Sequence, residues 1–273
     1  MSGSRTLVGV VQMTSTADVD ANMATVHRLV AEAASRGAKV VVVPECFAYL
    51  GPEAGKLPIA ESLEEGGPIL DRCREAARSA GCDVVYGGFW EKGAEADKVR
   101  NACIYMQADG SIASVYRKIH LFDVDLPDGT KVLESETVEA GGDPVVAEAP
   151  FGTLGLSVCY DLRFPELYRR LVDQGAIALA IPAAFTLTTG KDHWHVLLRA
   201  RAIEQQCYVL AAAQTGHHFG RRNSYGHALI VDPWGTVLAE CGAGEGVAVA
   251  EVNPSYVASV RGSLPSLAHR KLD

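Results

Sequence analysis

Short hydrophobic runs alternate with longer amphipathic stretches along the chain. The runs are rich in valine, isoleucine and leucine, which is typical of buried strands. In the first half, the expected strands lie at 6–13, 39–43, 83–89, 102–107 and 112–117. The last two flank the sequence ADGS, which predicts a hairpin. Residues 40–43 are four consecutive valines, so this strand is expected to be covered on both faces.

Between these strands, apolar residues recur at helical spacing. Asp18 is expected to cap a helix that runs to about Ser35, and Pro68 to begin a helix that Gly81 ends. The second half predicts strands at 154–158, 176–181, 208–213, 225–231, 236–239 and 246–252, and helices at 164–173 and 191–205. A long polar loop is expected at 118–143, and a tail that docks on the rest of the protein from about residue 253. Strands alternating with helices, with some hairpins, predict one α/β domain over residues 1–273.

Composition and charge exclude several classes of protein. Hydrophobic residues make up 48% and charged residues 21%, which is ordinary for a soluble globular protein. The formal net charge is −8 and no Lys/Arg-rich patch occurs, so no nucleic-acid partner is expected. No apolar run approaches the ~18 residues of a membrane span, and the first residues do not resemble a signal peptide. We therefore expect a cytoplasmic protein with no membrane partner.

Cysteine, histidine and glycine patterns indicate neither a metal nor a cofactor. The seven cysteines include no CxxC pair, so most are expected to be reduced core residues. His193 and His195 flank Trp194, and His217 and His218 are adjacent, but neither pair has the HExxH spacing. No GxGxxG or GxxxxGK[ST] motif is present. The sequence therefore predicts no metal and no cofactor.

Three reactive side chains each follow an expected strand. Glu45 follows 39–43, Lys118 follows 112–117 and Cys159 follows 154–158. Sites in α/β sheets form at the carboxyl ends of strands, so the three are candidates for one site. There, a cysteine attacks an electrophilic carbon, a carboxylate takes and returns the proton, and an ammonium stabilises the oxyanion.

Further features bear on Cys159 itself. The backbone N–H of Tyr160 is a possible second oxyanion donor. The helix expected near residue 164 would favour the thiolate of Cys159. The alternative is that Cys159 is an inert core residue, and that Glu45 and Lys118 are ordinary surface residues.

The motifs around these residues resemble those of the nitrilase superfamily, the carbon–nitrogen hydrolases. The similar segments are VVVPECF, YRKIHLFDVDLP and GLSVCYDLRFPEL, followed by PAAFTLTTGKDHWHVLLRARAIEQQCYVLAAAQTG and SYGHALIVDPWGTVLAE. The resemblance implies a Glu-Lys-Cys triad with Glu45 as general base, Lys118 for transition-state charge and Cys159 as nucleophile. It also implies an α/β fold, a four-layer α-β-β-α sandwich, that forms a homodimer or a higher homo-oligomer.

The same resemblance implies a second glutamate in the loop between Lys118 and Cys159. Glu134, in VLESET, is the preferred match, and Glu136 and Glu139 are the rival candidates. The motif CYDLRFPE implies a structural Arg163, expected in a buried ion pair, and an architectural Asp161. His120 is expected to be a hydrogen-bonded support rather than a catalytic residue.

Four residues are expected to contact substrate. The candidates are Tyr49, Tyr160, Phe185 and Thr186. Tyr49 follows the Glu45 motif, and Phe185 and Thr186 follow IPAA at the end of another expected strand. The alternative for each of them is loop packing.

Within the superfamily the likeness is to the Nit branch, which implies an amidase for small anionic linear amides. Hydrolysis to a carboxylate and ammonia would pass through a cysteine thioester. The expected substrate is deaminated glutathione. The alternatives are an omega-amidase acting on α-ketoglutaramate or α-ketosuccinamate, a nitrilase or carbamoyl-amine hydrolase, and, in another class, a catalytically silent binding or scaffold protein.

Overall fold

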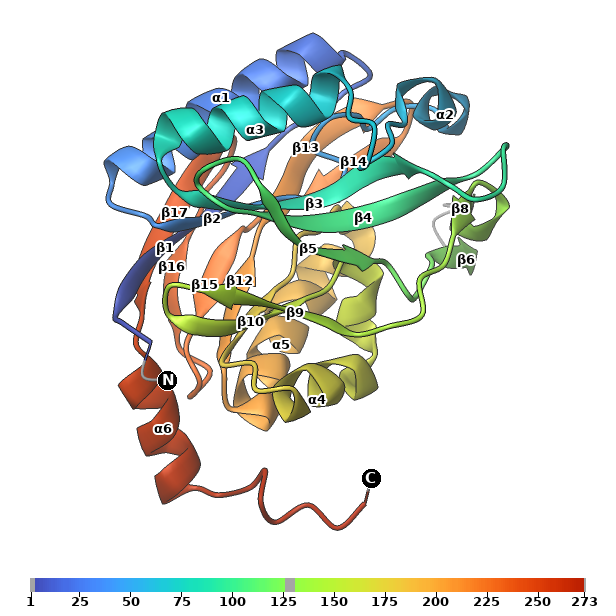
Figure 1. Cartoon of the computed structure of the whole chain (residues 1–273). Coiled ribbons are helices and arrows are strands. Elements are labelled where there is room, and N and C mark those ends of the chain that lie inside the picture. The colour runs from blue at the N-terminus through green and yellow to red at the C-terminus, as the bar shows by residue number, and fades with distance from the viewer. Residues whose placement is uncertain (1–2, 126–130, 273) are drawn as a thin grey trace.

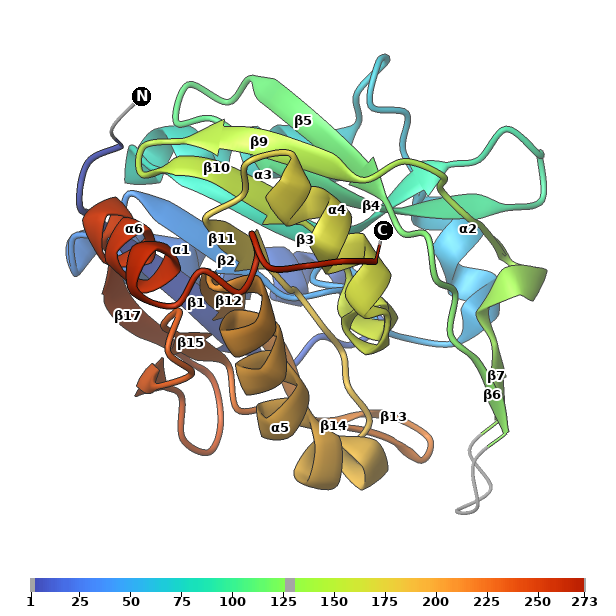
Figure 2. The same ribbon diagram turned by 90° about the horizontal axis from the view of Figure 1, so that it is seen from below.

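Two β-sheets pack face to face, and helices cover both outer faces, so the protein has four layers (Figure 1). The computed structural model describes residues 3–125 and 131–272. Helices α1 (Val19–Ser35) and α3 (Pro68–Ala80) cover the first sheet, and α4 (Pro165–Asp173) and α5 (Leu187–Gln205) cover the second (Figures 1 and 2). The expected α-β-β-α sandwich is confirmed.

The first sheet combines strands from the whole length of the chain. Its strands, in spatial order, are β14 (Arg222–Tyr225), β13 (Ala213–Phe219), β1 (Thr6–Met13), β2 (Val40–Val43), β3 (Asp83–Lys92), β4 (Val99–Met106) and β5 (Ile112–Arg117). In addition, β17 (Gly246–Val252) pairs with β1, and β8 (Val138–Glu139) pairs with β4.

The second sheet comes from the second half of the chain. Its strands, in spatial order, are β16 (Val237–Glu240), β15 (Leu229–Val231), β12 (Tyr208–Ala211), β11 (Ala178–Ala180), β10 (Gly152–Leu156) and β9 (Val145–Ala149). The chain passes from this sheet to the first one between β12 and β13, at Ala212. Ala212 therefore links the carboxyl end of β12, in the second sheet, directly to β13 in the first.

The valines of β2 explain how one strand serves two cores. Val40 and Val42 pack in the core between the two sheets, whereas Val41 and Val43 pack in the core under α1 and α3. Successive side chains of a strand point to opposite faces, so an all-apolar strand fits a sheet that is buried on both sides.

The ends of the first two helices follow their sequence signals. The Asp18 carboxylate accepts a hydrogen bond from the Ala21 N–H at 3.0 Å, and so caps α1. Pro68 is the first residue of α3, and Gly81 ends it in the left-handed conformation, with φ of 61°. These sequence predictions are confirmed.

Other boundaries differ from expectation. The expected strand 225–231 is two strands in different sheets, because Gly226 and His227 both have positive φ, 80° and 60°, and turn the chain from one sheet to the other. Helix α5 begins before Lys191, at Leu187, because the Thr186 side chain accepts a hydrogen bond from the Thr189 N–H. Strand β10 ends two residues before its expected end.

The expected polar loop 118–143 contains secondary structure. Its elements are β6 (Asp123–Asp125), β7 (Lys131–Leu133), a 3-10 turn (Glu134–Glu136) and β8. Strands β6 and β7 pair antiparallel, and β8 adds to β4. The pairing of β8 with β4 attaches the end of the segment to the first sheet.

The C-terminal tail docks on the second sheet, as predicted. Helix α6 (Pro254–Ser263) follows β17, and Arg261 on this helix donates hydrogen bonds to the carbonyls of Gln206, at 3.1 Å, and Ala176, at 2.9 Å. These carbonyls precede β12 and β11, so α6 fixes the turns that lead into both strands. Within the described residues, no helix is long and apolar enough to cross a bilayer.

Candidate active site

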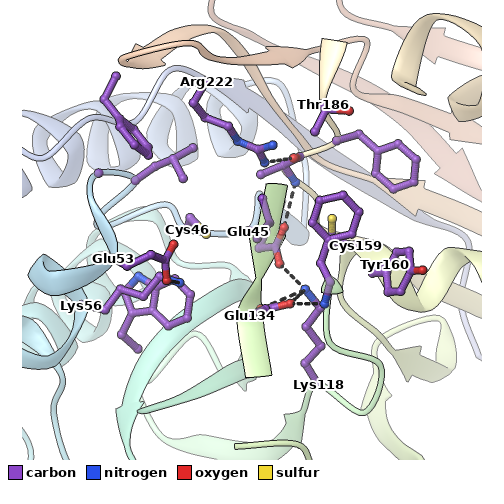
Figure 3. Close-up of a pocket in the computed structure, with 18 of the residues that line it drawn as sticks. Glu45, Cys46, Glu53, Lys56, Lys118, Glu134, Cys159, Tyr160, Thr186 and Arg222 are labelled. Carbon is purple, nitrogen blue, oxygen red and sulfur yellow. Dashed lines mark hydrogen bonds and ion pairs between the residues drawn. The ribbon is translucent and has the colours of Figure 1, made fainter. Parts of the chain in front are cut away.

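Glu45, Lys118 and Cys159 meet at the carboxyl ends of their strands (Figure 3). Glu45 follows β2, Lys118 follows β5 directly, and Cys159 lies just beyond the end of β10. The Lys118 Nζ lies 3.0 Å from Glu45 Oε1, and the Cys159 thiol hydrogen-bonds to the same carboxylate. All three side chains are buried. The fold thus brings together three residues that the sequence only suggested as neighbours.

Backbone and side-chain donors hold both oxygens of Glu45. Its Oε2 accepts the Ala184 N–H at 3.0 Å, and its Oε1 accepts the Asn101 amide at 3.0 Å. The chain at Glu45 also runs close against Gly88, where a Cβ would lie 2.5 Å from the Cys46 nitrogen, and where φ is +68°. Only glycine meets both demands there.

Asp161 ties the Lys118 segment to the Cys159 segment. Its carboxylate accepts the Tyr116 hydroxyl at 2.7 Å and the Val158 N–H at 2.8 Å. It also accepts the backbone N–H of His120, at 3.1 Å, and lies 2.7 Å from the Nδ1 of that residue. Asp161 therefore has the architectural position expected of it, and His120 is a hydrogen-bonded support.

Glu134 is the second glutamate of the site. Its carboxylate accepts Lys118 Nζ at 2.8 Å, the Asn101 amide at 3.2 Å and the Phe122 N–H at 2.6 Å. Glu136 is exposed, and Glu139 pairs with Arg100 at 2.8 Å instead. Of the three candidates, the structure brings only Glu134 to the lysine.

A pocket opens above Cys159, lined by residues from both sheets. Tyr160, Phe185 and Thr186 line it, and contact with substrate stays a prediction for them. Tyr49 is not among the lining residues of the described chain, contrary to expectation: its hydroxyl donates to the Pro52 carbonyl at 2.9 Å.

Arg163 lines the pocket, although the sequence predicted a buried ion pair for it. Its guanidinium forms no buried ion pair among the described residues; it lies 5.2 Å from the Phe185 ring centre and 3.3 Å from His193 Nδ1. The half-buried side chain lines the pocket as a cation without a carboxylate partner among those residues. The expectation of a buried ion pair was wrong, because within 3–125 and 131–272 the partners of the guanidinium are a histidine and aromatic rings.

Sequence analysis missed several residues of the site. These are Lys56, Trp90, Asn101, Phe219 and Arg222. Asn101 lies within β4, and Arg222 begins β14, where no local motif marks a polar residue as functional. Arg222 donates to the Ala184 carbonyl, while its buried Nη1 has no partner among the described residues. Only the pairing of the strands could have revealed them.

Comparison with known proteins places the chain in a family. A family model described as carbon–nitrogen hydrolase matches residues 7–262. The chain belongs to that family. This hydrolase is 46% identical over 267 residues to a Synechocystis protein named deaminated glutathione amidase, covering 97% of each chain.

Two further matches come from animals. The hydrolase is 43% identical to the human protein of the same name, covering 98% of this chain and 83% of the human one. The solved NitFhit protein of C. elegans superposes with a TM-score of 0.93 at 39% identity, over 99% of this chain and 66% of that one.

The charges in the hydrolase site are set by burial and by one another. Burial opposes the charge of Lys118, but the carboxylates of Glu134 and Glu45 more than offset it, so the pKa of Lys118 lies well above its ordinary value. Burial likewise opposes the charge of Glu45, but Lys118 and hydrogen bonds from Cys159 and Asn101 prevail and lower its pKa. Lysine and glutamate are therefore both ionised at neutral pH.

The surroundings of Cys159 do not favour the thiolate form, although the sequence predicted a helix start that would. Burial and then the Glu45 carboxylate raise the pKa of its thiol well above the ordinary value. Lys118 acts in the other direction without prevailing, and the segment after Cys159 is a 3-10 turn (Cys159–Arg163), with α4 starting only at Pro165. Cys159 therefore rests as a neutral thiol hydrogen-bonded to Glu45, and the expectation that a helix start would favour its thiolate was wrong.

We predict that iodoacetamide at neutral pH modifies Cys159 before the other six cysteines. All seven thiols have pKa values raised first of all by burial, but only Cys159 has a hydrogen-bonded carboxylate to take its proton. Glu45→Gln should slow the labelling at least about tenfold, because an amide cannot accept that proton. Peptide mapping by mass spectrometry at short times measures this.

The matched control for labelling is Glu136→Gln, which removes an exposed carboxylate near the site. It should leave the labelling rate unchanged. Equal labelling of several cysteines, or an unchanged rate in Glu45→Gln, would contradict the assignment of the base.

Proposed function

We propose that this hydrolase is a thiol amidase with Cys159 as nucleophile, Glu45 as general base and Lys118 as the cation that stabilises the oxyanion. One observation carries the proposal: a neutral thiol, an ionised carboxylate and an ammonium form one buried hydrogen-bonded network that faces a pocket. A catalytically silent scaffold would not need to keep two carboxylates and a lysine buried together, since burying charges is costly.

The geometry supports a two-step reaction. As the Cys159 sulfur attacks the amide carbon, its proton passes to Glu45, and the oxyanion forms near Lys118 and the Tyr160 N–H. Glu45 then returns the proton to the leaving nitrogen, the C–N bond breaks, and a thioester remains. Water next attacks the thioester and gives a proton to Glu45; the C–S bond then breaks, Glu45 passes that proton to the departing sulfur, and the acid is released. Lys118 keeps its proton throughout because its pKa is raised.

The substrate that we propose is deaminated glutathione. Support comes from the name of the Synechocystis and human relatives, and from the pocket, where Arg163 and Arg222 are cations suited to carboxylates and Phe185 offers an apolar wall. The leaving group from this substrate is the amino group of cysteinylglycine. Ammonia, the product expected from the sequence, would form only from a primary amide such as α-ketoglutaramate.

A substrate panel tests this proposal. Deaminated glutathione and α-ketoglutaramate both release 2-oxoglutarate, so one assay compares them directly; a nitrile and a carbamoyl amine are followed by ammonia. We expect kcat/KM for deaminated glutathione to exceed that for α-ketoglutaramate at least about tenfold, since only the first has a carboxylate beyond its scissile amide for the pocket cations to bind. Cys159→Ala should abolish turnover while the circular dichroism spectrum stays unchanged.

The reverse preference in this panel would make the protein an omega-amidase, and turnover of only the nitrile or the carbamoyl amine would assign it to those classes. Silence on all four compounds would overturn the substrate proposal. Turnover by Cys159→Ala would instead overturn the nucleophile.

We predict that Glu134→Gln lowers kcat by about 100-fold and leaves KM within a few-fold. With Glu134 neutral, Lys118 pairs with Glu45 alone, which lowers the pKa of Glu45 further and makes it a weaker base. Glu136→Gln is the matched control and should retain the wild-type kcat. Equal kcat values for Glu134→Gln and Glu136→Gln would contradict a role for Glu134 in the reaction.

We also propose that the protein forms a homodimer in the cytoplasm and repairs a metabolite there. Val196 and Ile203 lie two helical turns apart on α5 and are exposed, which supports pairing through this helix. All seven cysteines are free, which supports a reducing compartment. Light scattering should give twice the mass of one chain, and a monomer would contradict the pairing; cell fractionation tests the compartment.

A further inference from the structure

Two histidines and a glutamate meet outside the pocket, next to the second sheet. His195 lies on α5, His227 lies between β14 and β15, and Glu240 is the last residue of β16. One donor atom from each of the three lies within 4.8 Å of the other two. The proposed amide hydrolysis uses none of them.

Rigid elements hold each of these side chains. His227 has a φ of 60°, and its carbonyl accepts the Trp194 indole N–H at 2.8 Å. Glu240 pairs with Leu229 in the β15–β16 ladder. One turn after His195 on α5, Arg199 donates to the Gly235 carbonyl at 2.7 Å and so fixes the helix against the β15–β16 turn. The cluster is therefore preorganised by its backbone.

The distances suit a tetrahedral metal centre after small shifts. His195 Nε2 lies 3.0 Å, and His227 Nδ1 2.6 Å, from the same oxygen of Glu240. Ligands of a tetrahedral zinc ion, with bonds of about 2.0–2.1 Å, lie about 3.3 Å apart. The imidazole rings are inclined at 65° with centres 5.3 Å apart, so both nitrogens can face one point.

We propose that His195, His227 and Glu240 form a zinc-binding site. Two imidazole nitrogens and one carboxylate oxygen are a ligand set that favours Zn²⁺ over Mg²⁺ or Ca²⁺, which prefer oxygen ligands. The side chains are only partly buried, so water has access to a fourth position. Zinc there would join α5 to the connection before β15 and to the end of β16.

This site would support the pocket without touching substrate. Trp194 donates to the His227 carbonyl and packs against Phe185, with ring centres 4.9 Å apart. Phe185 lines the pocket. Zinc would therefore stabilise the fold on that side, with no role in bond cleavage.

Sequence spacing did not reveal the cluster because its ligands come from three elements. The rejected pairs His193–His195 and His217–His218 each contain at most one of these ligands. A search for HExxH or for neighbouring histidines does not find this site, because the β15–β16 hairpin and α5 come together only in the folded protein.

Zinc titration of tag-free, EDTA-treated protein tests the proposal. The Cys159→Ala background removes the pocket thiol as a competing ligand. Calorimetry should show one zinc ion per chain and no response to Mg²⁺, and the Tm should rise with zinc. Glu240→Gln and His227→Ala should each weaken zinc binding at least about tenfold. His217→Ala, an exposed histidine outside the cluster, is the control and should bind as the parent does.

Glu240→Gln keeps the size of the side chain, so its metal-free Tm shows whether the variant still folds. Loss of zinc binding in a folded Glu240→Gln protein supports the site. Equal zinc affinity in parent and cluster variants would overturn the proposal. So would a parent protein that shows neither heat nor a Tm change with millimolar zinc, because the cluster would then be a hydrogen-bonded one only.

Discussion

The buried ammonium of Lys118, held between Glu45 and Glu134, is the interaction on which the site depends. Its side chain is 2% exposed, so two carboxylates replace the water that would otherwise solvate it. Removing one partner of such a group typically costs about 3–5 kcal/mol, because an uncompensated charge remains buried. The same network keeps Glu45 ionised beside a neutral thiol, which is the state that the proposed general base needs before attack.

The fold brings these charges together from separate strands. Glu45 and Lys118 follow strands of the first sheet, and Cys159 follows a strand of the second. Asp161 connects the two sides through Tyr116 and His120, so the distance between lysine and cysteine does not depend on a mobile loop. The sandwich is thus a frame in which strand ends from two sheets face one another across one pocket.

Strand patterns predicted the ends of the first two helices and placed Glu45, Lys118 and Cys159 beside strand ends, because these features follow from local periodicity; the four layers followed from the family resemblance. Glu134 was the preferred of three glutamates, and only the β6–β7 pairing explains why it alone reaches Lys118. Tyr49 and Arg163 were misplaced because the direction of a side chain in a turn depends on packing.

Asn101, Arg222 and the His195–His227–Glu240 cluster were missed for a related reason. Each depends on neighbours that are distant in sequence, and strand pairing alone makes them neighbours. The charge state of Cys159 was also misjudged, since a helix start was weighed without the burial and the carboxylate that outweigh it.

The most direct test of the charge network is the pH dependence of kcat/KM for deaminated glutathione. The pKa of Glu45 lies below its ordinary value of 4.5, so the carboxylate stays ionised down to that pH and is protonated only below it. The pKa of the Cys159 thiol lies well above its ordinary value of 9.0, so the thiol stays neutral beyond pH 9.0. The account predicts a flat profile across the neutral range, with an acid limb below 4.5, while circular dichroism shows a folded protein. A limb that rises through neutral pH would contradict it, because the nucleophile would then be a titrating thiolate or depend on a histidine.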